Sequence, residues 1–435
     1  MVWLWRTFAV VSLLFILDRI VSTVGPDAEP PFANTRGVDV GAFYTVATML
    51  RQGQRHELGK VDAQLEVQAA IQEREQTGWR WFEPMPHPPV VALAALPLTE
   101  RSLRTAYWEF TIAAFLAAAF AAWLLARTLC PSAVLTITVV LLGFRPLWVL
   151  LWWGEDDTFV LVPVAVGILL LLTNHRSETG RPWRRELLAG ALLGAIALRP
   201  QFAIVPFLAL LLGRRMAAVG MAIGGGLLAV VSVVLVGFHD ALDYAELWRR
   251  YGSPTLWHPG VAPTYMFNVR GAIERWDPSW FSQTRWWVAL GGSVGLGLVV
   301  VALAGWALAR DRASELALSL IIVGMLVTAF HSHQQSMIFL SIPLAICIGR
   351  SLTLPFWPLG VLWALPAIAF LIGALAIENE LARQRVLTEI GLLVLVGFGV
   401  ALIATLLRSE SGRPVRANRA GSALGRILSL RPQRP

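Results

Sequence analysis

Apolar runs long enough to cross a bilayer recur along this chain, separated by short segments rich in arginine. A helix needs about 20 apolar residues to span the hydrocarbon core. Of the 435 residues, 56% are hydrophobic and only 15% are charged, whereas about a quarter of the residues of a soluble domain are charged. The sequence therefore predicts an all-α polytopic membrane protein.

The apolar runs predict a bundle of about 12 transmembrane helices. We place them near residues 3–22, 105–127, 132–149, 157–173, 187–198, 202–212, 216–237, 286–308, 315–330, 336–349, 355–376 and 387–407. We expect one transmembrane domain, residues 1–407, with extracytoplasmic loops at 23–104 and 238–285. A basic cytoplasmic tail, residues 408–435, follows it.

The net charge of +8 is distributed in a way that argues against nucleic-acid binding. With the N-terminus inside, the cytoplasmic segments carry 18 arginines and 5 acidic residues, and the rest of the chain carries 18 basic and 23 acidic residues. This asymmetry is the positive-inside bias of membrane proteins. It predicts that both termini are cytoplasmic.

Two segments of the first outer loop show helical periodicity. We expect two interfacial amphipathic helices there. Their apolar faces comprise Phe43, Val46, Ala47 and Leu50 in the first, and Val61, Leu65 and Ala69 in the second.

The runs 187–198 and 202–212 are too short to cross the bilayer separately, since each covers only about 18 Å of a core of about 30 Å. We expect a short helical hairpin that turns at Arg199 and Pro200. A cation at this depth needs an anionic partner. Arg199 would bind a lipid phosphate, or it would pair with an acid of the 155–157 cluster.

Asp39 immediately precedes the first amphipathic segment. Its carboxylate could cap backbone N–H groups. Near the headgroup plane it could instead accept a proton from a sugar hydroxyl as a general base.

Two other polar groups fall on outer loops. Glu155, Asp156 and Asp157 could bind a divalent cation or cap the span that begins at Thr158. His331 and His333 could hydrogen-bond a phosphate or a sugar, bind a metal, or remain hydrated imidazoles at the interface. A zinc site is weakly indicated, because the two histidines lack a matching carboxylate motif.

The order of several pieces resembles glycosyltransferase family 87. They are GVDVGAFYTVATMLRQGQ, PHPPVVALAALPL, AYWEF, WWGEDD, AGALLGAIALRPQ, YMFNVRGAI and HSHQQSMIFLSIPLA. This family belongs to the GT-C superfamily of polyprenol-phosphate-sugar-dependent enzymes and includes the α-mannosyltransferase of phosphatidylinositol mannoside synthesis. The resemblance implies a GT-C-like helical bundle.

The resemblance also implies roles for residues of these pieces. Asp39 would be the catalytic base, and Arg199, His331 and His333 would contact the donor phosphate. We expect substrate contacts from the remaining polar candidates, Tyr44, His87, Glu155, Asp156, Asn268, Arg270 and Gln334. No metal ligand set is assigned: we expect no cofactor, and a divalent cation is not favoured.

We therefore expect an inverting glycosyltransferase that moves a sugar, mannose as the first choice, from a polyprenyl-phosphate-sugar donor to a lipid-linked or cell-envelope glycan. Its active site would face the extracytoplasmic side of a bacterial-type plasma membrane. The partners would be the bilayer, the donor and the glycan acceptor, with no nucleic acid. A non-catalytic transporter or flippase of a lipid-linked sugar is the alternative, and a structural subunit of an envelope complex is a third hypothesis.

Overall fold

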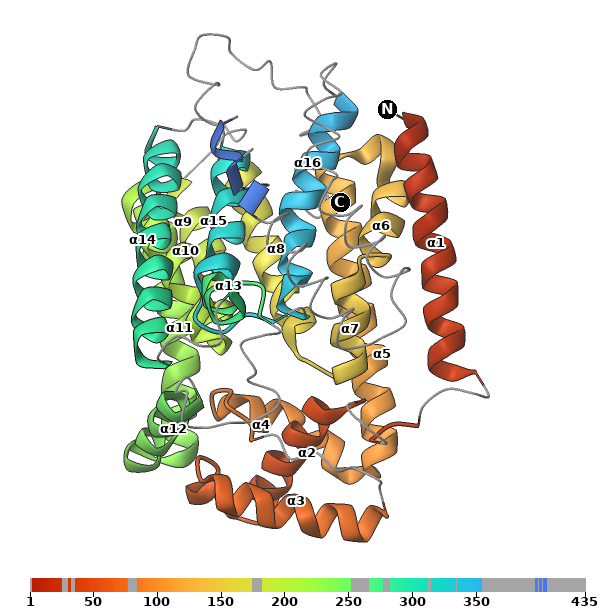
Figure 1. Cartoon of the computed structure of the whole chain (residues 1–435), viewed down its shortest axis with the longest axis vertical. Helices are drawn as coiled ribbons and strands as arrows, with labels where there is room; N and C mark the ends of the chain where they lie inside the picture. Colours follow the sequence, from red (N-terminus) through yellow and green to blue (C-terminus); the bar gives the residue numbers. More distant parts are fainter. Residues whose placement is uncertain are drawn as a thin grey trace, which may run out of the picture.

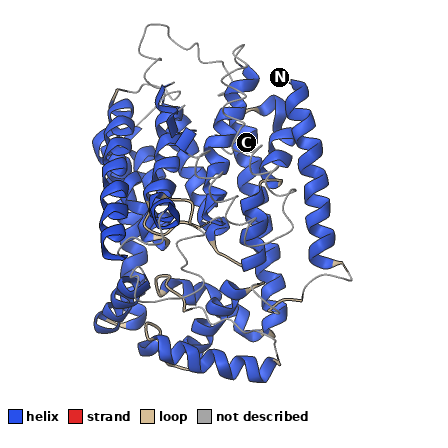
Figure 2. Ribbon diagram, in the orientation of Figure 1, coloured by secondary structure: helices blue, strands red, loops and turns tan. Residues whose placement is uncertain are grey.

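The fold is taken from a computed structural model of the chain. It describes residues 2–25, 30–32, 36–76, 84–173, 182–251, 266–276, 282–310, 314–333 and 335–353, with short pieces between 396 and 404. Within these ranges the secondary structure is helical, with connecting loops and turns (Figure 2). The predicted runs 355–376 and 387–407 lie wholly or largely outside the described residues, as does the tail 408–435.

The first half of the chain contributes the helices of the predicted outer loop and those of the first predicted spans (Figure 1). These elements are α1 (Val2–Val24), α2 (Val38–Arg51), η1 (Arg55–Glu57), α3 (Val61–Glu75), α4 (Val90–Ala95), η2 (Leu96–Glu100), α5 (Leu103–Leu129), η3 (Pro131–Ala133), α6 (Val134–Leu142), α7 (Arg145–Trp153) and α8 (Asp157–Thr173).

The second half completes the bundle. It comprises α9 (Pro182–Leu193), η5 (Gly194–Leu198), α10 (Pro200–Gly213), α11 (Arg215–Val236), α12 (Phe238–Tyr251), α13 (Val269–Trp276), α14 (Ser282–Ala309), α15 (Ser314–Thr328), η8 (Gln335–Leu340) and α16 (Ser341–Thr353). In Figure 1, α2, α3, α4 and α12 lie at the end of the bundle opposite the N-terminus.

Four described helices are long and apolar enough to cross a membrane, namely α1, α5, α11 and α14. The pair formed by Pro131–Leu142 and Arg145–Trp153 bends by 49° and adds a fifth if it counts as one span. Several shorter apolar helices, including α8, α10 and α15, pack inside the bundle. The all-helical membrane class is confirmed, while the expected number of about 12 spans stays a prediction.

The predicted hairpin is present as α9, η5 and α10. Arg214, after the last residue of α10, pairs with Glu186 near the start of α9 at 3.1 Å. The two ends of the hairpin that lie away from its turn therefore meet. The helix is interrupted at Arg199, because Pro200 has no N–H to continue the preceding helix.

Small residues let the hairpin pack closely against α11. A Cβ added at Gly190 or Gly220 would collide with a backbone carbonyl of the facing helix, that of Ala217 or Leu187. Close backbone approach through small residues is the usual way in which membrane helices associate. This contact holds the hairpin, and with it Arg199, in the middle of the fold.

The two outer-loop helices form where the periodicity predicts them, but their environments differ from the prediction. Eleven of the 14 residues of α2 are buried, because α3, α4, α5 and η2 surround it. In α3, Leu65 is 49% exposed and Ala69 is exposed. The buried face instead carries Gln64, Gln68 and Ile71.

Hydrogen bonding explains why a glutamine lies on the inner face of α3. The Gln64 side chain donates to the Leu58 carbonyl at 2.6 Å and accepts from the Met85 backbone N–H at 2.9 Å. These two bonds satisfy loop backbone groups that would otherwise be buried without partners. Gln64 therefore joins the segments before and after α3.

Candidate active site

An acidic turn between α7 and α8 forms the centre of the candidate site. Gly154 ends α7 in the left-handed conformation, with a φ of 80°, which favours glycine. The next residues, Glu155, Asp156 and Asp157, are all buried, and Asp157 opens α8. The tight turn therefore brings three carboxyl groups together inside the protein.

Arg199 reaches this turn from the tip of the hairpin. Its Nη2 contacts Glu155 Oε2 and lies 2.7 Å from Asp156 Oδ1, and its Nε lies 2.8 Å from Asp157 Oδ1. The side chain of Arg199 is only 10% exposed. The sequence left two partners open for Arg199, a lipid phosphate or an acid of the 155–157 cluster. In the structure Arg199 pairs with the acidic cluster.

The charges in this cluster do not balance. In the described part of the chain, Arg199 is the arginine partner of all three carboxylates. Three ionised carboxylates and one guanidinium would leave two negative charges in a buried place, which is costly. Burial accordingly raises the pKa of Asp156 to about 7.

His87 approaches the cluster from the loop before α4. Its Nδ1 lies 3.7 Å from Asp156 Oδ2, and its ring packs edge-on against Phe43 of α2 with centroids 5.2 Å apart. Burial, and then the positive charge of Arg199, hold the pKa of His87 well below its usual range. The imidazole is therefore neutral, and one donor atom each from His87, Glu155 and Asp156 lie within 4.8 Å of one another.

The histidine loop after α15 closes another side of the site. The rings of His331 and His333 meet edge-to-face with centroids 4.4 Å apart. Burial lowers the pKa of His331, and the electrostatic effect of its neighbours, that of His333 first, lowers it further. Gln334 lies outside the described residues.

Asn268 and Arg270 attach α13 to this histidine loop. The Asn268 amide donates to the Ala329 carbonyl at 2.8 Å, and its oxygen accepts from the Gly271 N–H at 2.8 Å. Asn268 thus caps α13 and fixes it to the end of α15. The guanidinium of Arg270 lies over the Phe330 ring, 4.2 Å from its centroid.

Asp39 lies in the first turn of α2, next to Val40, which contacts the glycine before the acidic turn. The N-cap position of α2 belongs to Gly37, whose N–H donates to the Trp152 carbonyl at 2.8 Å. A Cβ at Gly154 would collide with the Val40 side chain, so the start of α2 contacts the residue before Glu155. Asp39 also shares a helix face with Phe43, which contacts His87.

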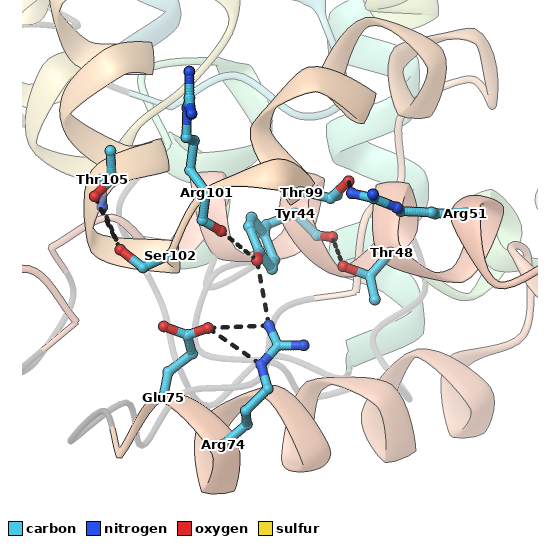
Figure 3. Close-up of polar contacts among 9 residues, drawn as sticks. All are labelled: Tyr44, Thr48, Arg51, Arg74, Glu75, Thr99, Arg101, Ser102 and Thr105. Atoms are coloured by element: carbon cyan, nitrogen blue, oxygen red, sulfur yellow. Dashed lines mark hydrogen bonds and ion pairs between the residues drawn. The ribbon is translucent and has the colours of Figure 1, made fainter.

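Tyr44 belongs to a different group of residues, drawn in Figure 3. It is 2% exposed, and its hydroxyl donates to the Arg101 carbonyl at 2.8 Å and accepts from Arg74 Nη2 at 3.2 Å. Arg74 also pairs with Glu75 at 3.0 Å. These contacts tie α2 to α3 and to the start of α5, and a substrate contact of Tyr44 stays a prediction.

The structure adds residues that the sequence did not single out. Gln335 Nε2 donates to Glu155 Oε1 at 3.2 Å. Arg36, which is 1% exposed, lies against the rings of Tyr107, Trp108 and Trp152, with ring centroids between 4.9 and 5.3 Å away. No local pattern indicates Arg36, because its aromatic partners come from distant helices.

Comparison with known proteins identifies the family. The sequence model of glycosyltransferase family 87 matches residues 86–332, which is more than half of the chain. This range contains His87, the acidic turn, Arg199 and His331. No curated protein and no solved structure matches the chain. The chain belongs to glycosyltransferase family 87, and its family and its long apolar helices together make it a membrane glycosyltransferase.

Proposed function

We propose that this protein transfers a sugar, with mannose as the first choice, from a polyprenyl-phosphate-sugar donor to a lipid-linked or cell-envelope glycan. The site faces the extracytoplasmic side of a bacterial-type plasma membrane, and both termini are cytoplasmic. Family membership supports glycosyl transfer. The arginine distribution along the chain supports the orientation.

One observation carries this proposal. Residues distant in the sequence, His87, Asp156 and Arg199, meet at one place, next to the start of α2, the helix that holds Asp39. Burial of ionisable groups in such a cluster strengthens every charge interaction with a reacting molecule. A cluster of this kind suits a reaction in which charge moves from a sugar to a phosphate.

The reaction follows from the roles of these groups. Asp39 accepts the proton of the acceptor hydroxyl, and the oxygen attacks C1 of the donor sugar. The bond between C1 and the phosphate oxygen breaks, and the polyprenyl phosphate leaves with the electron pair. Because attack comes from the face opposite the phosphate, the configuration at C1 is inverted, and a single base suffices.

The donor phosphate needs positive or hydrogen-bonding groups on its side of the sugar. We assign this role to Arg199, His331 and His333, with Arg270 and Asn268 lining the adjoining loop. Neutral imidazoles can donate hydrogen bonds to phosphate oxygens. The carboxylates around Arg199 offset its charge, so the phosphate side requires more than this one guanidinium.

The experiment compares Asp39→Asn with wild type in transfer of radiolabelled mannose from polyprenyl-phosphate-mannose by the purified protein. Loss of the base should lower transfer by about 10²–10⁴-fold while donor binding is retained. Asp62→Asn is the matched control, since Asp62 lies in the first turn of α3 and is exposed. Wild-type rates in the Asp39→Asn variant would remove Asp39 as the base, and donor binding without transfer by wild type would favour the carrier hypothesis.

A further inference from the structure

The acidic turn has more negative charge than its arginine partner can compensate. Glu155, Asp156 and Asp157 are 6%, 7% and 0% exposed, and Arg199 is their shared guanidinium in the described part of the chain. A buried deficit of positive charge is relieved by protonation or by a second cation. The position of His87 favours a second cation over protonation.

His87 is placed as a ligand rather than as a hydrogen-bonding partner. It is 6% exposed, and its Nδ1 makes no hydrogen bond within the described residues, although it points at Asp156 Oδ2 from 3.7 Å. A buried nitrogen without a partner is costly. Such an imidazole nitrogen can be satisfied by binding a metal ion.

The arginine and the histidine use different oxygens of the same carboxylate. Arg199 Nη2 lies 2.7 Å from Asp156 Oδ1, whereas His87 Nδ1 faces Oδ2. On Glu155, Arg199 contacts Oε2 and the Gln335 amide donates to Oε1. A cation bound between His87 and the acidic turn would therefore not have to displace Arg199 from Asp156.

The spacing is close to that of a coordination sphere. Ligand atoms at about 2.1–2.2 Å from a divalent ion lie about 3–4.3 Å apart, and the three donor atoms of His87, Glu155 and Asp156 lie within 4.8 Å of one another. A small contraction of the side chains would complete the site. Two carboxylate oxygens and one imidazole nitrogen suit an ion such as Mn²⁺.

We propose that His87, Glu155 and Asp156 bind one divalent cation of the Mn²⁺ class, whose remaining coordination positions accept oxygen ligands. This departs from the sequence-based expectation of no metal. If the proposed glycosyl transfer is correct, on which this role rests, the donor phosphate would occupy such a position. The cation would then supply the positive charge that Arg199, surrounded by carboxylates, cannot supply alone.

The binding test uses the purified full-length protein in detergent, stripped of metal with a chelator and then titrated with Mn²⁺ while the free ion is followed by electron paramagnetic resonance. We expect one equivalent bound per chain and at least about tenfold weaker binding in His87→Ala. His239→Ala, which removes an exposed histidine of α12, should bind as wild type does. Glu155→Gln, which keeps the shape of the side chain, should also weaken binding.

Absence of a stoichiometric Mn²⁺ in wild type, or equal affinity in wild type and His87→Ala, would overturn the site. Melting temperatures measured without metal establish that each variant is folded. The role in transfer is tested separately, since chelation should abolish mannose transfer and Mn²⁺ should restore it. Transfer that persists after the ion is removed would overturn that role, whereas Mn²⁺ binding without transfer under any condition would count against the proposed function and not against the site.

Discussion

At the scale of single residues, the site depends on the buried ion pairs of Arg199. Its three carboxylate partners come from one turn, and one guanidinium partly compensates their mutual repulsion. Removing one member of a buried ion pair leaves the others uncompensated, which is more costly than losing an exposed pair. Arg199 is therefore as much a structural residue as a candidate ligand of phosphate.

We expect Arg199→Ala to destabilise the protein by about 3–5 kcal/mol. Arg19→Ala is the control, because Arg19 forms an exposed pair with Asp18, and such pairs contribute about 0–1 kcal/mol. Thermal unfolding of both variants in the same detergent compares them. Equal melting temperatures would show that the buried cluster does not stabilise the fold.

The sequence anticipated some residue contacts and not others. The pairing of Arg199 with the 155–157 acids was one of two options, because a cation at membrane depth must meet an anion. The approach of His87 to Asp156 could not be predicted, since it depends on how the loop before α4 packs against α2. The cage of rings around Arg36 is likewise a property of tertiary packing.

At the scale of elements, the end of α7 contacts the start of α2, the helix that carries the proposed base Asp39. The Gly37 N–H bonds to the Trp152 carbonyl, and Gly154 lies against Val40. Both glycines have positive φ, which lets the two turns approach without side chains between them. Few other residues could fill these two positions.

Gly154→Ala should therefore impair both stability and transfer. The positive φ costs about 1–2 kcal/mol for a residue with a Cβ, and the collision with Val40 adds about 1–3 kcal/mol. Gly53→Ala is the matched control, because Gly53 has a φ of 79° but open space around its Cβ position. Unfolding and mannose transfer should be measured for both.

A second substitution can distinguish the collision with Val40 from the backbone strain at position 154. Val40→Ala combined with Gly154→Ala returns space to the contact and should recover part of the lost transfer. Equal loss of transfer in Gly154→Ala and Gly53→Ala would refute a role for this contact in placing Asp39.

Helical periodicity located the outer-loop helices but did not predict which of their residues are buried. Phe43, Val46 and Ala47 of α2 are buried, whereas Leu65 of α3 is exposed and Gln64 is buried. A glutamine that satisfies two backbone groups can occupy an inner face, and hydrophobicity alone cannot anticipate this. The hairpin at Arg199 was predictable, because its length and its proline leave few alternatives.

At the scale of the whole molecule, the chain is an all-helical membrane bundle with a helical cap at the end opposite its N-terminus (Figure 1). The bundle class follows from the apolar runs, whereas the number of crossings does not, because several apolar helices are shorter than a bilayer is thick. The positive-inside distribution predicts that this cap is extracytoplasmic.

Cysteine labelling checks this orientation. The two native cysteines, Cys130 and Cys347, are buried, so their background labelling should be low. In intact cells a membrane-impermeant maleimide should label Gln54→Cys, between α2 and η1, and should label Arg310→Cys, after α14, only once the membrane is permeabilised. Both positions are exposed, and the reverse pattern would invert the proposed topology.

We expect a lipid-linked sugar to bind with its phosphate toward the cluster of His87, Glu155, Asp156 and Arg199, and with C1 facing Asp39. A structure of the protein with bound polyprenyl-phosphate-mannose tests this directly. We expect phosphate density beside that cluster and the sugar between it and the Asp39 carboxylate. A phosphate bound elsewhere, or a sugar with Asp39 on the same side as the leaving phosphate, would contradict it.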